Sequence, residues 1–385
     1  MFSGFKRKLF SASAILLLCM GLPTLAVAGA KIKIDDTKWF SIGLGFRSSF
    51  AITEDGAPSG TDPSKGVSLE NMRLYTAGQV HKNITLEFNT ELSNGNSTLS
   101  RDSDQSIRVL DAVAKFSIKG FDVWAGRFLP PSDRSNLDGP FYLNNFDFPI
   151  VQAYPAIFAG RDNGIAIMRE YGGGKFKWSY GAFEGRTNNT NSDTNPDQTD
   201  SLLHAARFTY NFWAPEPGYY TTSSYYGTKD VLAVAFVFQH ENNGAGTATE
   251  TETGDFTAWN VDVLMEKKLG NGGVVNLEGA YYDYDMDDKT DASLIQGEGY
   301  LALGSYLLPQ QMGWGKLQPY VRYQHFARDN TNASANRGNR TVTEGGVNYI
   351  IDGQNAKITT SYSADRNGSN ADAKNTFKVG FQFQL

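Results

Sequence analysis

The chain has 385 residues, of which 40% are hydrophobic and 20% charged, and its mean hydropathy is −0.39. That composition excludes a helical membrane protein, because each spanning helix needs about 20 consecutive and predominantly apolar residues. The formal net charge of −6 argues against a protein that binds nucleic acid, since such proteins carry basic surfaces.

The N-terminus has the three parts of a secretory signal peptide. Residues 6–8 are basic, residues 15–22 are apolar, and an Ala-Val-Ala cleavage site follows. A single anchoring helix is the alternative, but the apolar run is short for a bilayer. We expect residues 1–28 to be removed together with Cys19, the only cysteine, and residues 29–385 to form one domain.

Alternation of apolar and polar residues over eight or more positions predicts a strand with two different faces. The first such strand places Phe40, Ile42 and Leu44 on one face. The pattern recurs sixteen times, an even number, as in bacterial membrane barrels. The predicted strands span residues 39–52, 69–80, 84–92, 107–118, 121–128, 164–170, 175–186, 202–212, 231–241, 256–269, 274–284, 296–308, 316–326, 340–351, 356–365 and 375–385.

The connections between these strands alternate in length. Most connections after even-numbered strands are brief and rich in Gly, Asn and Asp, the residues of tight turns. Most connections after odd-numbered strands are long and polar, such as residues 53–68, 93–106, 187–201, 242–255 and 330–339. Membrane barrels show this asymmetry between periplasmic turns and external loops, whereas a soluble β-sandwich has no need for it.

Two connections depart from this rule. Leu129–Asp162, after the fifth strand, contains five prolines and six aromatic residues. A long loop this apolar should pack against something, and the barrel interior is the expected partner. Trp213–Lys229, after the eighth strand, lies on the short-turn side and contains four tyrosines. It could contact lipid headgroups or a neighbouring subunit, or it could pack locally.

The final nine residues, FKVGFQFQL, alternate to the end of the chain, with Phe377 and Leu385 on the apolar face. We expect this sixteenth strand to pair with the first, which would close the sheet and remove both edges. The predicted fold class is therefore all-β, a transmembrane antiparallel barrel of 16 strands with a long third external loop folded into the pore. The apolar ending resembles the signal read by the barrel-assembly machinery, although that signal usually ends in Phe.

Charged side chains on the strands should face the channel, because a charge facing lipid costs roughly 2–4 kcal/mol at mid-bilayer. The expected lining bases are Arg47, Arg73, Lys115, Arg127, Arg207 and Arg322. The expected lining acids are Glu87, Glu91, Asp111, Asp262, Glu266, Glu278 and Glu298. These charges could produce a transverse field that sets selectivity, or they could pair along the wall. Arg127, at the root of the long loop, is the first candidate for contacting a solute, and Arg134 and Asp133 within that loop come next.

Other chemistry has little support in the sequence. Asp283–Asp291 contains five aspartates and could hold hard cations associated with lipopolysaccharide, but a solvated loop explains this composition as well. The four histidines lie in separate segments without metal-ligand spacing. We expect no metal and no cofactor. An enzyme on the barrel rim is an alternative without a supporting motif.

Several motifs occur in an order that carries a family resemblance. They are Arg73-Leu74-Tyr75 with Gly78-Gln79, then Leu110-Asp111-Ala112, then Trp124-Ala125-Gly126-Arg127-Phe128 followed by Pro130-Pro131. With these motifs the chain resembles the phosphate-selective porin O and P family of Gram-negative outer membranes. The resemblance implies a sixteen-stranded barrel, a trimer, and a third external loop folded into the pore, a position that Leu129–Asp162 matches. The arginine ladder and lysine cluster of the phosphate-specific members do not map in full onto this chain.

Together these observations predict a porin in the outer membrane of a Gram-negative bacterium, through which small hydrophilic solutes or ions diffuse passively. A selective anion channel, phosphate included, is the first alternative, and a structural sheath for a partner protein is another. The expected partners are outer-membrane lipid and lipopolysaccharide, the solutes, further copies in a homotrimer, and the barrel-assembly machinery. No nucleic acid is expected.

Overall fold

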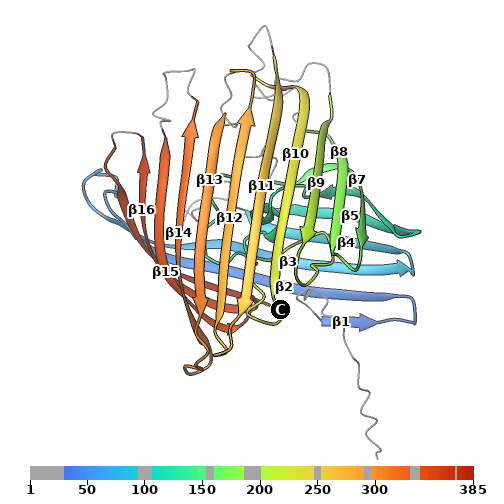
Figure 1. Ribbon diagram of the computed structural model, residues 1–385, viewed down its shortest axis with the longest axis horizontal. Coiled ribbons are helices and arrows are strands. Elements are labelled where there is room, and N and C mark those ends of the chain that lie inside the picture. Colours follow the sequence, from blue (N-terminus) through green and yellow to red (C-terminus); the bar gives the residue numbers. More distant parts are fainter. Residues whose placement is uncertain are drawn as a thin grey trace, which may run out of the picture.

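A computed structural model describes residues 30–93, 106–152, 160–185, 201–246, 253–289, 296–329, 339–368 and 371–385. Strands β2 to β17 form a closed antiparallel barrel in which strands adjacent in sequence pair (Figure 1). A short strand β1, Ala30–Lys33, and a helix α1, Arg134–Asp138, complete the described elements. The barrel strands are β2 Trp39–Thr53, β3 Ser64–His81, β4 Ile84–Ser93, β5 Ser106–Ile118, β6 Phe121–Phe128, β7 Asp162–Tyr171, β8 Phe176–Phe183, β9 Leu203–Asn211, β10 Val231–Ala245, β11 Gly254–Lys268, β12 Val274–Asp285, β13 Gly297–Leu307, β14 Lys316–Arg328, β15 Arg340–Asp352, β16 Ala356–Asn367 and β17 Lys374–Gln384.

The predicted sixteen-stranded barrel is confirmed, and β17 closes it on β2, with Phe383 opposite Phe46. The largest difference lies at the start of β3, which begins five residues earlier than predicted because Ser64 still pairs with Thr53 of β2. The connection expected at residues 53–68 is therefore a shorter loop. The signal peptide and most residues of the other predicted long loops lie outside the described part of the chain.

Side chains alternate along the strands between an exposed apolar face and a buried polar face. On β2, Phe40, Ile42 and Leu44 are exposed, whereas Arg47 and Ser49 are buried. A soluble protein shows the reverse arrangement. A barrel in lipid requires this one, because charges and amides avoid the hydrocarbon and gather inside.

Strand β1 was not predicted from the sequence and lies beside the barrel seam. It pairs with Trp39–Ile42 at the start of β2. The chain end occupies the next part of the same β2 edge, where Leu44 and Leu385 exchange backbone hydrogen bonds of 3.0 and 2.9 Å. The ammonium of Lys31 lies 4.0 Å from the ring centroid of Trp39. Strand β1 thus covers backbone groups that would otherwise form an open edge.

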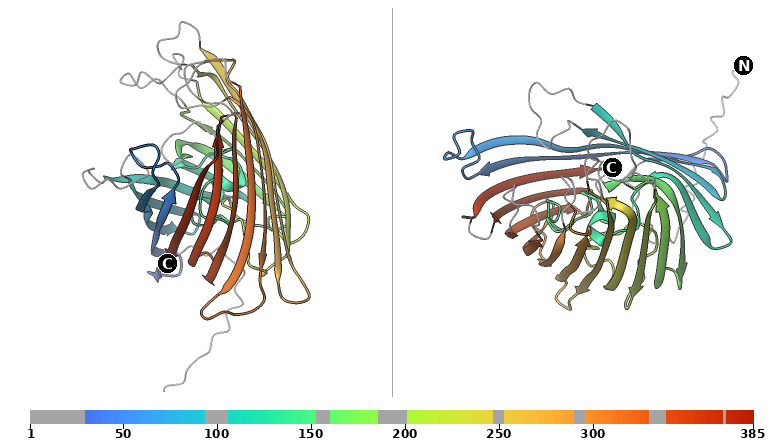
Figure 2. Two further views of the ribbon diagram at one scale, coloured as in Figure 1. Left: turned by 90° about the vertical axis from the view of Figure 1, so that its left-hand side faces the viewer. Right: turned by 90° about the horizontal axis from the view of Figure 1, so that it is seen from above.

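Two connecting segments occupy the barrel interior. Residues 129–152, which contain α1, follow β6, and residues 213–229 join β9 to β10. Viewed from above, α1 lies within the ring of strands (Figure 2). The helix starts where the side chain of Asp133 accepts a 3.1 Å hydrogen bond from the backbone of Ser135, a normal N-cap. Among the described residues, no helix has the length and apolar character needed to span a membrane.

Candidate channel interior

Five of the six predicted strand cations lie on the inner face. Arg47, Arg73, Arg207 and Arg322 are 3–6% exposed, and the side chain of Lys115 is 18% exposed. All except Arg73 share that face with other buried polar residues of the same strand. The alternation of the strands therefore orients these cations inward.

Most of these cations are paired with carboxylates on nearby strands. Arg207 shows the geometry best, because its two Nη atoms lie 2.5 and 3.0 Å from the carboxylate oxygens of Asp262. Such a two-point contact is the strong form of an arginine–carboxylate pair. The sequence left open whether these charges produce a transverse field or pair along the wall, and these residues pair along the wall. The pairs are Arg73–Glu91, Lys115–Glu87, Arg207–Asp262 and Arg322–Glu344.

Arg47 from the predicted set and one cation that was not predicted, Lys357, lack such a partner on the inner face. Arg47 of β2 and Lys357 of β16 flank Gln382 of β17 in one row of the sheet. In the described part of the chain neither has a carboxylate within ion-pairing distance. Arg47 donates to the carbonyl oxygen of Phe146, and Lys357 donates to that of Leu143 at 2.8 Å. Among the described residues, this side of the interior therefore holds two basic side chains without a partner acid.

The far side holds carboxylates that accept hydrogen bonds from neutral groups. Glu266 of β11 accepts 2.8 Å bonds from the hydroxyl of Ser224 and from the backbone N–H groups of Tyr225 and Gly227. Asp138 of α1 accepts bonds of 2.6 and 2.7 Å from two hydroxyls of the same segment. Burial raises the pKa of Asp138. These carboxylates of the far side are therefore bonded to neutral donors of the segment that joins β9 to β10.

The segment of residues 129–152 contacts the wall on both sides. Near its start, Asp133 accepts a 2.7 Å hydrogen bond from the hydroxyl of Tyr282 on β12. Near its end, the carboxylate of Asp147 lies 2.7 Å from the Nζ of Lys378 on β17. The described part of the predicted inward loop therefore crosses the barrel interior, while residues 153–159 of that loop lie outside the described chain.

Arg134, at the start of α1, is the centre of a buried ionic network. Its side chain is 1% exposed, and its Nη atoms lie 3.0 and 2.7 Å from the two carboxylate oxygens of Glu216. Burial by itself would raise the pKa of Glu216, but the guanidinium of Arg134 outweighs it and lowers that pKa to about 2. The pair is therefore ionised at neutral pH.

Arg127 is placed differently from the prediction. The inward residues of β6 are Trp124 and Phe128, so Arg127 has the opposite parity, and the register sets it beside Ala112 of β5 and Asn163 of β7 on the outer face. The prediction applied the lipid penalty for a charge along the whole strand. That penalty falls to roughly 0–1 kcal/mol near the membrane interfaces, and Arg127 is the penultimate residue of its strand.

Glu298 differs from the prediction in the same way. It is the second residue of β13 and shares its face with the exposed Tyr300, whereas Leu301 is buried on the inner face. Charges at strand ends can therefore occupy the outer face, so the parity argument is reliable only in the middle of a strand.

Sequence reasoning missed several charged residues of the interior. Lys357 and Lys378 sit on the polar faces of β16 and β17, and counting parity along those two strands would have found them. Glu216 lies in an irregular segment, where no period shows which side chains turn inward. Its role depends on how that segment folds.

Two of the histidines and the acidic segment make local contacts. His204 and His240 lie opposite each other on β9 and β10, and a ring nitrogen of His204 is 2.7 Å from the hydroxyl of Tyr180. Asp287 accepts a 2.7 Å hydrogen bond from the backbone of β11, while residues 290–291 lie outside the described chain. Within the described ranges, no group of three or more His, Cys, Asp or Glu is arranged to hold a metal ion.

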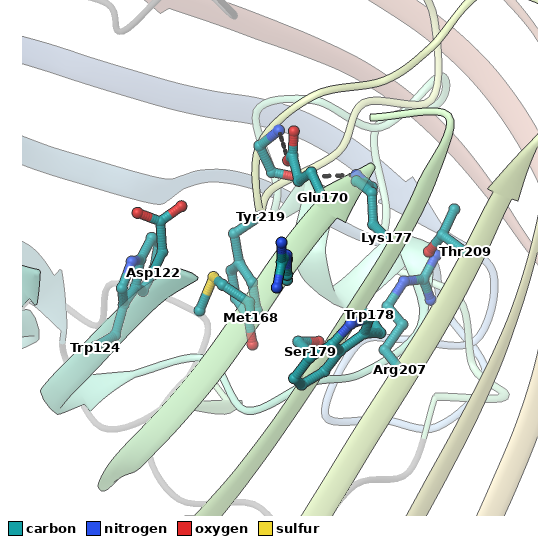
Figure 3. A pocket seen from close by; sticks show the side chains of 12 residues that line it. Asp122, Trp124, Met168, Glu170, Lys177, Trp178, Ser179, Arg207, Thr209 and Tyr219 are labelled. Atoms are coloured by element: carbon teal, nitrogen blue, oxygen red, sulfur yellow. Dashed lines mark hydrogen bonds between the residues drawn. The ribbon is translucent and has the colours of Figure 1, made fainter. Parts of the chain in front are cut away.

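A cavity of about 130 Å³ lies between β6–β9 and the segment that joins β9 to β10 (Figure 3). Lys177 donates a 2.8 Å hydrogen bond to the carbonyl of Gly218, and Glu170 accepts one from the backbone of the same glycine. Trp124 and Tyr219 contribute aromatic rings to the lining. The volume suffices for a few water molecules.

A closed antiparallel barrel that is apolar outside, and charged and crossed by a loop inside, defines the class of outer-membrane channels. Residues 40–385 match the model of the family "Phosphate-selective porin O and P", and the chain belongs to this family. The resemblance drawn from the sequence motifs is confirmed. Family and architecture together indicate a channel in the outer membrane rather than an enzyme.

Solved structures with a similar fold share little sequence with this chain. The Salmonella typhi OmpF complex with daunomycin is 11% identical, with a TM-score of 0.59 over 92% of this chain and 100% of that chain. The anion-selective porin from Comamonas acidovorans is 11% identical, with a TM-score of 0.56 over 90% and 100%. Outer-membrane expressed OmpT of Vibrio cholerae is 12% identical, with a TM-score of 0.55 over 92% and 100%. These likenesses show the fold.

One curated relative, an uncharacterized protein of Aquifex aeolicus (strain VF5), is 24% identical over 205 residues. The match covers 51% of this chain and 47% of the relative. The chain thus spans about half the length of the relative that it matches.

Proposed function

We propose that the channel lets small hydrophilic solutes or ions diffuse down their gradients, and that residues 129–152 form part of its constriction. The main support for this proposal is that residues 129–152 cross a barrel interior lined with charged side chains. This segment contacts Tyr282 on one side and Lys378 on the other. Polar groups on the wall can replace part of the hydration of a solute, while a narrow cross-section excludes larger ones. No energy source is required.

A preference for anions is the second candidate. It is favoured by Arg47 and Lys357, two buried cations in one row of the sheet without an acidic partner among the described residues. Unpaired charges in a low-dielectric interior exert a stronger field than paired ones. The similar porin from Comamonas acidovorans is described as anion-selective, which agrees with this candidate. Phosphate is one of the anions to be tested.

Recording from planar bilayers tests both statements. We expect stepwise conductance. In a tenfold KCl gradient, the reversal potential should lie closer to the equilibrium potential of chloride than to that of potassium. The double variant Arg47→Gln/Lys357→Gln should shift the reversal potential toward the equilibrium potential of potassium. The control is Lys267→Gln, which removes a half-exposed cation at the barrel rim. A barrel without conductance would refute the channel function, and an unchanged reversal potential in the double variant would refute the basis for anion preference.

We also infer that the mature protein is an exported homotrimer in the outer membrane of a Gram-negative bacterium. The basic, apolar and small-residue parts of the first 28 residues support cleavage of a signal peptide. The trimeric form named for OmpT of Vibrio cholerae supports the oligomer. Native mass spectrometry of the detergent-extracted protein should give three chains, each starting at residue 29. A full-length or monomeric species alone would contradict these two inferences.

A further inference from the structure

The connection between β9 and β10, residues 213–229, is named here the turn-side segment. It lies at the same barrel end as the short turns that join β5 to β6 and β7 to β8, opposite the loop that follows β6. A tight turn would suffice there, yet this segment folds into the barrel. Its residues Glu216 and Thr221–Ser224 are all 3% exposed or less.

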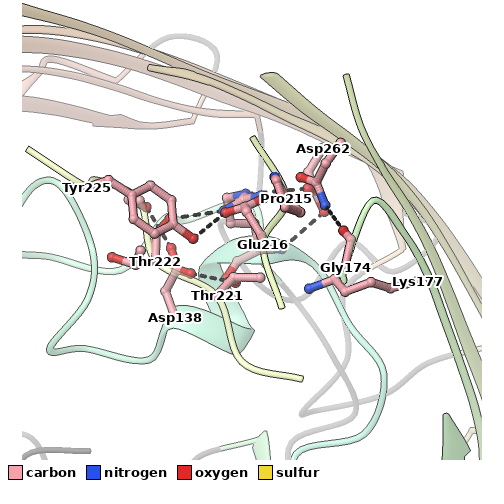
Figure 4. A network of polar contacts seen from close by, with 12 residues as sticks. Asp138, Gly174, Lys177, Pro215, Glu216, Thr221, Thr222, Tyr225 and Asp262 are labelled. Carbon is pink, nitrogen blue, oxygen red and sulfur yellow. Dashed lines mark hydrogen bonds and ion pairs between the residues drawn. The ribbon is translucent and has the colours of Figure 1, made fainter. Parts of the chain in front are cut away.

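The turn-side segment binds directly to the loop segment that enters from the other end (Figure 4). The hydroxyls of Thr221 and Ser223 donate bonds of 2.6 and 2.7 Å to the two carboxylate oxygens of Asp138. Glu216 forms the buried ion pair with Arg134. These contacts join two segments that are far apart in sequence and enter from opposite ends.

The same segment is also bonded to the wall. The hydroxyl of Ser224 and the backbone N–H groups of Tyr225 and Gly227 each donate a 2.8 Å bond to Glu266 of β11. Asn276 of β12 donates a 2.7 Å bond to the carbonyl of Ser223. The segment therefore bridges the wall and the loop.

Burial shows what this bridge does to the pathway. A loop that only narrows an open pore keeps one face in water. Asp133 and Arg134 instead are 0% and 1% exposed, and residues 128–141 are all buried. The loop segment is thus covered on both faces, and the turn-side segment supplies part of the cover.

We propose that the turn-side segment is a second constriction of the channel, docked in this structure, and that solutes pass when residues 221–227 leave this docked position. This inference rests on the proposed channel function. Its chemistry is that of a polar latch, in which carboxylates of the loop and wall hold the hydroxyls and amides of the segment.

Aromatic packing and hydrogen bonds both hold the turn-side segment in place, and most of the hydrogen bonds belong to residues 221–227. The ring centroids of Tyr219 and Tyr220 lie 4.9 and 5.8 Å from that of Trp124, so the first half is anchored by aromatic packing. Residues 221–227 carry most of the hydrogen bonds to the loop and the wall, which water can replace at little net cost, and Tyr225 and Tyr226 also pack against apolar residues of the wall. Tyr226 and Gly227 have φ angles of 53° and 76°, a left-handed bend suited to a hinge.

A cross-link between the two segments tests this proposal. The variant Asp138→Cys/Ser223→Cys lacks two latch hydrogen bonds, and residues 29–385 contain no other cysteine. In planar bilayers the reduced variant should conduct at least as often as the wild type. A short bis-methanethiosulfonate should abolish its conductance, and dithiothreitol should restore it. The control is Arg340→Cys/Asp365→Cys, an ion pair at the external strand ends, whose cross-linking should leave the conductance unchanged.

The outcomes separate the two levels of the proposal. Equal conductance before and after a cross-link verified by mass spectrometry would overturn the latch while leaving the channel function in place. Absence of conductance from wild type, reduced variant and control alike would reject the channel function and the latch with it.

A second variant tests the latch without a reagent. Glu216→Gln removes the charge from the buried pair with Arg134 and from the acceptor of the 2.6 Å hydrogen bond that Tyr225 of residues 221–227 donates, so the ratio of open to closed time should rise about tenfold or more. Asp365→Asn, which breaks the half-exposed pair with Arg340, is the matched control and should leave the ratio unchanged. An unchanged ratio in a folded Glu216→Gln channel would contradict the latch.

Discussion

Replacing residues 130–160 with a four-residue Gly-Asn-rich turn is expected to raise the single-channel conductance several-fold. Phe128 of β6 pairs directly with Asp162 of β7, so a short hairpin turn can join the two strands without changing the barrel. The replacement removes the segment that crosses the interior together with the surface on which the turn-side segment docks. The conductance in molar KCl across a planar bilayer measures the result.

A second external loop provides the matched control. Thr53 and Ser64 pair across β2 and β3, so residues 55–62 can be replaced by a similar turn. This change should leave the conductance at the wild-type value. If both replacements gave the same conductance, the loop segment would not be the constriction.

The variant Phe236→Arg is expected to lower the free energy of unfolding by about 2–4 kcal/mol, the cost of a charge on the lipid face at mid-bilayer. Phe236 lies in the middle of β10 and is 42% exposed, on the face opposite Gln239. In a membrane this exposed ring meets hydrocarbon. Urea titration of the protein in lipid vesicles, followed by the temperature-dependent gel shift of barrels, measures the loss.

Phe236→Leu separates charge from size. It leaves the face apolar and should change the free energy of unfolding by less than about 1.5 kcal/mol, the usual limit for an apolar exchange. If the arginine variant were as stable as the leucine variant, this part of β10 would face protein or water rather than lipid.

The sequence predicted the barrel well because a strand between lipid and a polar lumen must alternate, and alternation can be read directly. The bounds of β5, β6 and β12 match the prediction to within a residue. Pairing of β17 with β2 was predicted because an open sheet edge would leave backbone N–H and C=O groups unpaired inside the bilayer. Strand β1 was not predicted because its four residues are too few to show an alternating pattern.

The interior was harder to predict, for physical reasons. Parity says which strand side chains turn inward but not which carboxylate each cation meets, and Arg207 pairs with Asp262 two strands away. In irregular segments parity has no meaning, so the bond of Glu216 to Arg134 could not be anticipated. The predicted inward orientation of Arg127 was wrong for a third reason. The free-energy cost of a charge on the outer face depends on its depth in the membrane.

The reversed placement of apolar and polar side chains has a consequence for how this protein can evolve. Lipid chains are fluid and fill any shape, so an outward position such as Val234 or Phe238 can exchange among apolar residues without leaving a cavity. Inside, each buried amide or carboxylate must keep a bonding partner, as Glu266 does with Ser224. Selection should therefore hold polar identities more tightly than apolar ones, and a comparison of related chains would find its most constant positions among the glutamates, arginines and asparagines of the lumen.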